Sequence, residues 1–160
     1  KDTGAPKFTP EDYAFAKEIA ETYPEVLARD RRVMKEEYGV NGDDKFLCDV
    51  VFDKVIEDRL VAPGSTDVGD VGYAAPTLNL LVATACVGNV GHSWQMTAQA
   101  CSPLAHKGLL TAAEAMALSA VRTKHRPDAI AAAKAEVLAR NGGKYTCPLP
   151  DSVKPPLDTY

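Results

Sequence analysis

The sequence has no long hydrophobic run and no block of basic residues. Its longest apolar run, residues 80–87, is interrupted by Thr84 and is far shorter than the ~20 residues that a membrane-spanning helix needs. Lys and Arg number 18 against 22 Asp and Glu, so the formal net charge is −4, and no basic stretch is interleaved with aromatic residues. We therefore expect neither a membrane nor a nucleic acid as a partner, and we expect a soluble protein of the cytoplasm.

Cysteine is scarce, and several catalytic motifs are missing. The four cysteines form no C-x-x-C pair, which argues against a zinc knuckle or a redox dithiol and favours reduced core thiols: Cys48, Cys86, Cys101 and Cys147. No G-x-S-x-G sequence marks a serine nucleophile, and the G-x-x-G matches lack the lysine or third glycine of phosphate-binding loops. The chain also begins at Lys1 without Met, so we expect it to be a piece of something longer.

The composition is that of an ordinary globular protein, with 46% apolar and 25% charged residues in a chain of 160. This length allows one domain around one core. We expect residues 1–143 to form part of that domain. Residues 144–160 carry four prolines and little periodicity, so we expect an extended tail there.

Two helices are predicted near the start of the chain. Thr9 suits the N-cap and Pro10 the first helical position, while Phe8 and Tyr13 can form a hydrophobic staple. Pro24 interrupts this first helix. The second helix then continues to Gly39, which is expected just beyond its end because glycine tolerates the left-handed conformation found there.

Two further helices are predicted in the second half of the chain. The longer one runs from Pro103 to Arg126, and the next from Pro127 to Asn141. The longer helix is expected to bury a stripe of seven apolar residues: Leu109, Leu110, Ala113, Met116, Ala117, Ala120 and Val121. His106 is expected to pack near the start of this helix, and His125 suits the negative dipole at its end.

Between the two pairs of helices, the pattern predicts strands and loops. Residues 45–55 are rich in β-forming side chains, and residues 78–87 are apolar on both faces, as in a buried central strand. Residues 62–73 and 88–95 are predicted as loops, the first from its three glycines and two aspartates. The whole pattern predicts an α/β fold. Since ligands bind at strand ends in open α/β sheets, we expect the functional residues in these loops.

His92 is the principal candidate for chemistry. It follows the predicted strand, where a neutral imidazole can bind a metal, relay a proton or simply bond to the backbone of a tight turn. Asp67 and Asp70 can hold the other nitrogen of a histidine, accept hydrogen bonds from a substrate or cap turns. Ser65 and Thr66 precede Asp67, but nothing marks either hydroxyl as an activated nucleophile.

Four segments together resemble a known family. They are GSTDVGDV at residues 64–71, GHSWQ at 91–95, AHKG at 105–108 and the late PLP and KPPLD at 148–158. In order and spacing they look like the C-terminal part of the aminobenzoyl-glutamate utilisation amidohydrolases, across residues 8–158. These belong to the co-catalytic metallopeptidases that include the aminoacylases and the hippurate and auxin-conjugate hydrolases.

The resemblance implies a two-metal amidohydrolase, with zinc or manganese, that cleaves the amide of an N-acyl amino acid such as p-aminobenzoyl-glutamate. It implies that His92 is the last metal ligand and is followed by Ser93. Six residues are expected at the substrate or in support of the ligand: Ser65, Thr66, Asp67, Asp70, Ser93 and Trp94. Trp94 can form the floor of an aromatic acyl pocket or pack in the core.

The resemblance also implies what the chain lacks. The other metal ligands, the general-base glutamate and a lid domain are expected in an N-terminal half outside this sequence. The fold is then the incomplete C-terminal portion of a zinc-peptidase-like three-layer α/β catalytic domain. We expect the chain to be inactive alone, to associate into homo-oligomers and to need its missing half as a partner. The alternative is a stand-alone, non-catalytic α/β binding or interaction domain.

Overall fold

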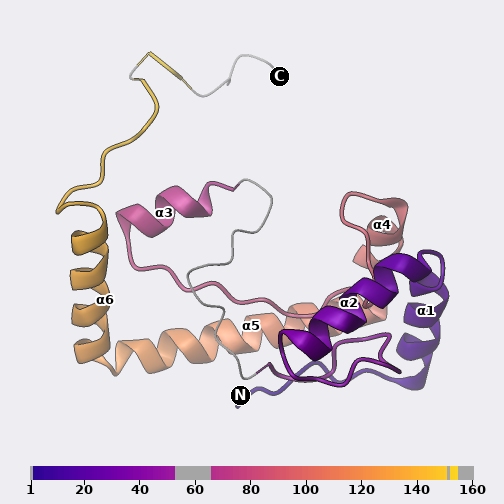
Figure 1. The fold of residues 1–160 in the computed structure, drawn as a ribbon. Coiled ribbons are helices and arrows are strands. Elements are labelled where there is room, and N and C mark those ends of the chain that lie inside the picture. Colours follow the sequence, from indigo (N-terminus) through magenta and orange to yellow (C-terminus); the bar gives the residue numbers. More distant parts are fainter. Residues whose placement is uncertain (1, 53–65, 151, 155–160) are drawn as a thin grey trace. The chain divides into compact units, whose positions relative to one another are not determined.

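The computed structural model describes residues 2–52, 66–150 and 152–154, and these form helices without a sheet (Figure 1). The helices are α1 (Pro10–Ala20), α2 (Pro24–Glu36), α3 (Val68–Ala74), α4 (Trp94–Ala100), α5 (Pro103–Lys124) and α6 (Pro127–Arg140). Helices hold 53% of the described residues and strands hold none. The predicted α/β fold, and with it the three-layer α/β domain, is therefore wrong for the part of the chain described.

The start of α1 is as predicted. The backbone N–H of Asp12 donates to Thr9 Oγ1 at 3.4 Å, and the Thr9 N–H donates to Asp12 Oδ2 at 2.7 Å, which completes a capping box. The rings of Phe8 and Tyr13 meet edge to face with their centroids 6.2 Å apart. The predicted N-cap and staple are confirmed because both depend only on neighbours within one turn of helix.

The end of α2 also follows the prediction. Gly39 has a φ of +67° and lies just beyond the helix, where the Val40 N–H donates to the carbonyl of Met34 at 2.9 Å. Only glycine adopts such a φ without a steric penalty from a Cβ atom. The helix therefore closes near the position that the sequence marked.

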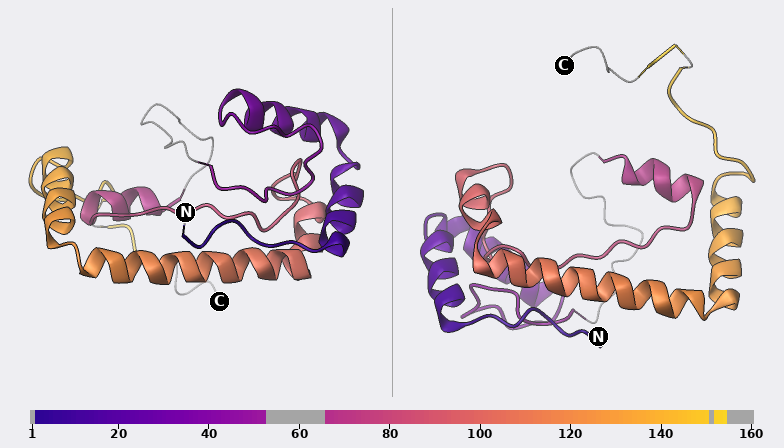
Figure 2. Two further views of the ribbon diagram at one scale, coloured as in Figure 1. Left: turned by 90° about the horizontal axis from the view of Figure 1, so that it is seen from below. Right: turned by 180° about the vertical axis from the view of Figure 1, so that it is seen from behind.

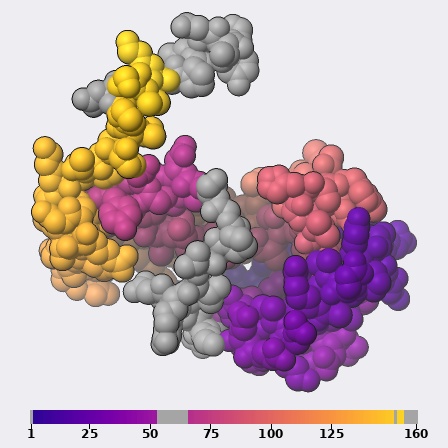
Figure 3. Space-filling view, turned by 45° about the horizontal axis from the view of Figure 1, so that its top comes forward, coloured from indigo at the N-terminus to yellow at the C-terminus, as the bar shows by residue number. Residues whose placement is uncertain are grey.

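The chain divides into two compact units, which are described separately. Unit 1 comprises Lys1–Leu60 and Leu80–Ala120, and unit 2 comprises Val61–Asn79 and Val121–Tyr160. The core of unit 1 is formed by Ala16, Ile19, Ala20, Leu27, Met34, Leu47, Cys86, Val87 and Leu104. Figure 3 shows α1 and α2, in indigo to purple, gathered against the salmon-coloured residues of α4 and the loop before it. Unit 1 thus has a small but closed core.

Neither predicted strand forms within the described residues. Residues 45–52 are irregular, residues 53–55 lie outside the described part, and residues 78–87 carry no strand ladder. Between the described residues of the two segments there is one backbone hydrogen bond, from the Val87 N–H to the Phe46 carbonyl at 2.9 Å. Leu78 and Leu81 are 76% and 86% exposed. A strand needs neighbours that pair its N–H and C=O groups, and one rung does not make a sheet.

The first part of α5 runs alongside residues 80–87 (Figures 1 and 2). The closest approach is at Gly108, where an added methyl group would overlap the carbonyl oxygen of Ala83. Leu104 and Ala105 are buried on the same side of the helix. The residues predicted as its buried stripe are all exposed instead: Leu109, Leu110, Ala113, Met116, Ala117, Ala120 and Val121. His106 is exposed as well, so its predicted packing is also wrong.

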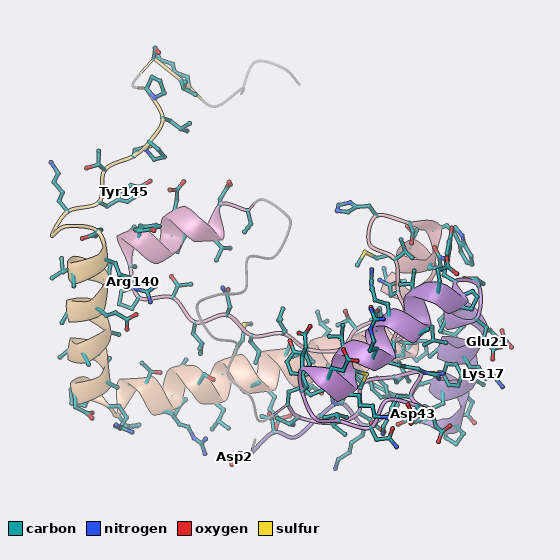
Figure 4. The ribbon with its side chains drawn as sticks, viewed as in Figure 1. Asp2, Lys17, Glu21, Asp43, Arg140 and Tyr145 are labelled. Carbon is teal, nitrogen blue, oxygen red and sulfur yellow. The ribbon has the colours of Figure 1, made fainter. Side chains whose placement is uncertain are left out.

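Unit 2 contains α3, α6 and the described part of the C-terminal segment. Asn141, at the end of α6, donates from Nδ2 to the carbonyl of Tyr73 in α3 at 2.9 Å. The predicted loop 62–73 is wrong from Val68 onward, because a helix begins there, and residues 62–65 lie outside the described part. Figure 4 labels Arg140 near the end of α6 and Tyr145 in the segment that follows. The predicted division at residues 143 and 144 stays a prediction.

All four cysteines are free thiols, but they do not share one environment. Cys86 is buried, Cys48 is partly buried, and Cys101 and Cys147 are exposed. The prediction of core thiols is therefore right for Cys86 and wrong for the two exposed residues. Among the residues described here, no helix combines the length and the apolar character that a bilayer crossing requires.

Candidate functional site

The candidate site is the His92 loop, which we define as residues 88–93, between Val87 and the start of α4. Gly88 opens the loop with a φ of +83°, and a Cβ atom there would lie 2.8 Å from Leu27 Cα. The Gly88 N–H donates to Asp30 Oδ2 at 3.1 Å. Because the loop passes so close to the α2 backbone, only glycine fits at this position.

A buried amide from α4 holds the beginning of the loop. Gln99 Oε1 accepts the backbone N–H of Cys86 at 2.7 Å, and Gln99 Nε2 donates to Asn89 Oδ1 and to the Gln95 carbonyl, each at 3.0 Å. The Gln99 side chain is fully buried. A buried amide with all these bonds made favours one arrangement of its neighbours, since each lost bond would leave a polar group unpaired.

His92 lies exposed in the loop with a φ of +55°. No other non-glycine residue in the described ranges has a positive φ. This left-handed conformation costs about 1 to 2 kcal/mol for a residue with a side chain, and such strain is found preferentially at functional sites. The loop therefore holds His92 in a disfavoured backbone conformation with its side chain exposed.

The two residues after His92 are placed differently from each other. The Ser93 hydroxyl donates to the Val90 carbonyl at 2.5 Å and makes no cap bond to α4. Trp94 begins α4 and is 56% exposed, so it does not pack in the core of unit 1. The predicted roles of Ser93 and Trp94 at a substrate stay predictions.

Gln95 and Gln99 were not predicted from the sequence. The Gln95 side chain is 1% exposed, its Nε2 donates to Thr22 Oγ1 at 3.2 Å, and its Oε1 has no partner among the described residues. The signal that could have found these glutamines is their spacing, which puts them on one face of a helix. The prediction of a loop over residues 88–95 hid that signal, because α4 begins inside this range.

The described residues do not form a complete metal centre. No three His, Cys, Asp or Glu side chains in these ranges are grouped closely enough to hold a metal ion. His92 offers one imidazole, whereas catalytic zinc sites use three protein ligands. The prediction that His92 binds a metal ion therefore stays a prediction.

The second predicted loop lies in unit 2. Ser65 is outside the described residues, Thr66 Oγ1 accepts the Val68 N–H at 3.4 Å, and Asp67 and Asp70 are exposed. The Asp67 carbonyl accepts the Val71 N–H at 3.2 Å at the start of α3. Since His92 belongs to unit 1, the predicted meeting of the two loops in one site stays a prediction.

Asp70 lies close to a tyrosine from the segment after α6. Partial burial, a hydrogen bond with the Cys147 thiol and the charge of Asp70 raise the pKa of the Tyr145 phenol. Asp70 is thus near a partner in its own unit. The predicted role of Asp70 at a substrate stays a prediction.

One comparison with known proteins identifies a relative. The chain is 29% identical to a subunit of the p-aminobenzoyl-glutamate hydrolase of Escherichia coli (strain K12) over 164 aligned residues, which cover 95% of this chain. They cover 33% of the relative, so the chain spans about a third of the length of the curated protein it matches. No family model and no solved structure matches the chain. The predicted resemblance to the aminobenzoyl-glutamate utilisation amidohydrolases is confirmed.

Proposed function

We propose that this chain contributes the His92 loop to the active site of an amidohydrolase that cleaves N-acyl amino acids such as p-aminobenzoyl-glutamate. The observation that carries the proposal is the similarity to a p-aminobenzoyl-glutamate hydrolase subunit along 95% of the chain. A second support is the loop itself, in which His92 is exposed with a φ of +55° between bonded neighbours. The proposed substrate and activity are those that the name of the relative gives.

The reaction defines what a complete site must provide. Amide hydrolysis adds a water oxygen to the carbonyl carbon, breaks the C–N bond and delivers a proton to the departing nitrogen. A general base must accept a proton from the water, and cationic or hydrogen-bonding groups must stabilise the developing oxyanion. The His92 loop contains one titratable side chain and no carboxylate. We therefore propose that the remaining groups come from outside this chain and that the chain is inactive alone.

We propose that this chain contributes one ligand to a metal centre and not the whole centre. Zinc or manganese is implied by the family resemblance, but the described residues contain no group of three side chains that could hold such an ion. His92 is the residue that would bind such an ion from this chain, as one ligand among several. A metal would polarise the amide carbonyl and acidify a bound water.

The partner of the chain is then the rest of a longer hydrolase polypeptide. The exposed apolar stripe of α5 supports this, because large exposed apolar patches mark interaction surfaces. A homo-oligomer built on the same stripe is the second arrangement that we propose. The relative is named as one subunit of its hydrolase, which concerns that protein alone.

The test is a chimera in which this chain replaces the matching third of the E. coli protein. We expect the chimera, expressed as the relative normally is, to release p-aminobenzoate and glutamate from p-aminobenzoyl-glutamate. His92→Ala should abolish this turnover and lower the metal content without lowering the melting temperature of the chimera. His125→Ala, at the exposed end of α5, is the matched control and should retain both activity and metal.

Two results would contradict the proposal. One is full activity in His92→Ala together with loss of activity in His125→Ala. The other is robust hydrolysis by the isolated 160-residue chain, since the general base is proposed to lie outside it. A folded chimera that binds other proteins but never hydrolyses the substrate would favour the alternative of a non-catalytic interaction domain.

A further inference from the structure

The bonds that hold the His92 loop converge on one side chain. Gln99 accepts from the backbone of Cys86, which precedes the loop, and donates to the side chain of Asn89, which lies inside it. Its third bond, to the carbonyl of Gln95, fixes the amide within α4 itself. A single buried amide therefore connects the entry of the loop to the helix that follows its exit.

The bonds at the two ends of the loop restrict the backbone conformation of His92. Between Asn89, held by Gln99, and Ser93, the residue before α4, only Val90, Gly91 and His92 remain. The Ser93 hydroxyl also donates back to the Val90 carbonyl at 2.5 Å. The disfavoured φ of His92 can persist because both ends of this short segment are bonded.

We propose that Gln99 is the positioning residue for His92, and that it acts through its bond to Asn89 Oδ1. The proposal rests on the proposed function, in which His92 is the residue that the chain contributes to the site. Gln99 is fully buried, so its side chain acts through the loop and not by contact with a substrate. Its role is to keep the imidazole where the loop presents it, so that ligand binding does not have to order the loop first.

A purely structural glutamine would behave differently. If Gln99 only filled space in unit 1, its replacement would loosen the core and the loop together. A positioning role predicts instead that loss of the Asn89 bond alone loosens the loop and leaves α1 as it was. Asn89 is therefore the better position for the decisive variant, because the Gln99 bonds to Cys86 and Gln95 survive its truncation.

The experiment uses the full 160-residue chain and measures backbone ¹⁵N order parameters by NMR, with the melting temperature as the folding check. Asn89→Ala removes the acceptor and is expected to lower the order parameter of His92 from about 0.85 to below about 0.6. Asn89→Asp keeps an oxygen at the same place and should restore the wild-type value. Met96→Ala, on the exposed side of α4, is the control and should leave His92 unchanged.

Gln99→Met gives a second, independent measurement. It should loosen His92 at least as much as Asn89→Ala. The double variant should add little to Gln99→Met, since both substitutions remove the bond between Gln99 and Asn89. Unchanged order at His92 in Asn89→Ala, or an equal loss of order at Ile19 in α1, would overturn the positioning role. The chimera assay tests the proposed function separately. If the chimera is inactive but Asn89→Ala still lowers the order parameter of His92, the proposed hydrolase function is refuted and the positioning role of Gln99 is not.

Discussion

At the scale of single residues, the backbone of His92 is the least expected feature of the molecule. Residues with a Cβ atom avoid the left-handed region because that atom approaches the neighbouring carbonyl oxygen. Histidine visits this region more often than branched residues do, yet it still pays a steric cost. The φ of +55° therefore indicates that the surrounding bonds outweigh a local preference.

This strain gives a prediction about stability. His92→Gly should leave the chain as stable as wild type or up to about 1 kcal/mol more stable, because relief of strain offsets the entropy that glycine adds to the unfolded chain. His92→Val should lose at least about 1 kcal/mol, since a β-branched residue is worse in this conformation. Urea unfolding monitored by circular dichroism measures both changes.

His125 is the matched control for this comparison. It is exposed, as His92 is, but its φ is not positive. His125→Gly should therefore lower stability, because glycine adds unfolded-state entropy there without relieving any strain. Equal losses in His92→Gly and His125→Gly would show that the His92 backbone carries no strain.

At the scale of elements, local signals were predicted and non-local ones were not. The Thr9 N-cap and the Gly39 helix end were predicted because each depends on residues within a few positions. The strand predicted over residues 78–87 does not form. An apolar run shows only that a segment is suited to a sheet, whereas strand pairing depends on partners that are distant in the sequence. Helix α3 was missed because its two glycines, Gly69 and Gly72, favour a loop by composition.

The contact of α5 with residues 80–87 gives the second prediction. Gly108→Ala should destabilise the chain by at least about 2 kcal/mol, because the new methyl group meets the Ala83 carbonyl and the Thr84 side chain. This loss should exceed the roughly 1 kcal/mol that alanine gains over glycine within a helix. Gly91→Ala is the control, with open space around its Cβ position, and should change stability by about 0.5 kcal/mol or less. Similar urea midpoints for the two variants would contradict the packing described.

The ion pair between α1 and α5 gives a pH-dependent prediction. Burial opposes ionisation of Asp12, but the hydrogen bonds from Lys107 and from Thr9 outweigh it and hold the pKa of this carboxyl below its ordinary value of 3.8. A depressed carboxyl pKa stabilises the fold above the unfolded pKa, and this contribution is lost as pH falls through the folded pKa. The stabilisation from Asp12 is therefore full at about pH 7 and disappears below about pH 4.

Asp12→Asn should cost about 2 kcal/mol at about pH 7, because hydrogen bonds to a charged partner are replaced by neutral ones. The difference from wild type should shrink steadily below about pH 4, where the wild type loses its own charge. Urea unfolding from acidic to neutral pH measures this difference. Asp128→Asn, which breaks an exposed pair with Arg126, is the control and should change little at any pH. A constant difference between Asp12→Asn and wild type would show that the charge of Asp12 is unimportant.

At the scale of the whole molecule, the candidate site was predicted only in part. The sequence directed attention to His92 and the residues before α4 through the GHSWQ segment. It did not reveal the Gln99 and Asn89 bonds, because side chains ten positions apart meet only after the chain has turned back on itself. The predicted stripe of α5 is apolar, but it is exposed and not buried. Helical periodicity shows that one face is apolar but not what covers that face.

The exposed stripe leads to the last prediction, which concerns association. Leu110 is 68% exposed and Met116 is 61% exposed on the part of α5 that belongs to unit 1. Exposed apolar side chains in one contiguous stripe favour self-association when no other chain covers them. We expect the isolated chain to form dimers or larger species as its concentration rises. Sedimentation velocity measures this, and Leu110→Glu combined with Met116→Glu should shift the chain towards the monomer at equal concentration.

Leu138→Glu separates the effect of the stripe from the effect of added charge. Leu138 is 52% exposed on α6, so the substitution also replaces an exposed apolar side chain with a carboxylate, on a different helix. If Leu138→Glu dissociates the assembly as strongly as the double variant, net charge rather than the α5 stripe governs association. A wild-type chain that stays monomeric at every concentration would contradict the prediction directly. Association that survives in the double variant would place the contact on another surface.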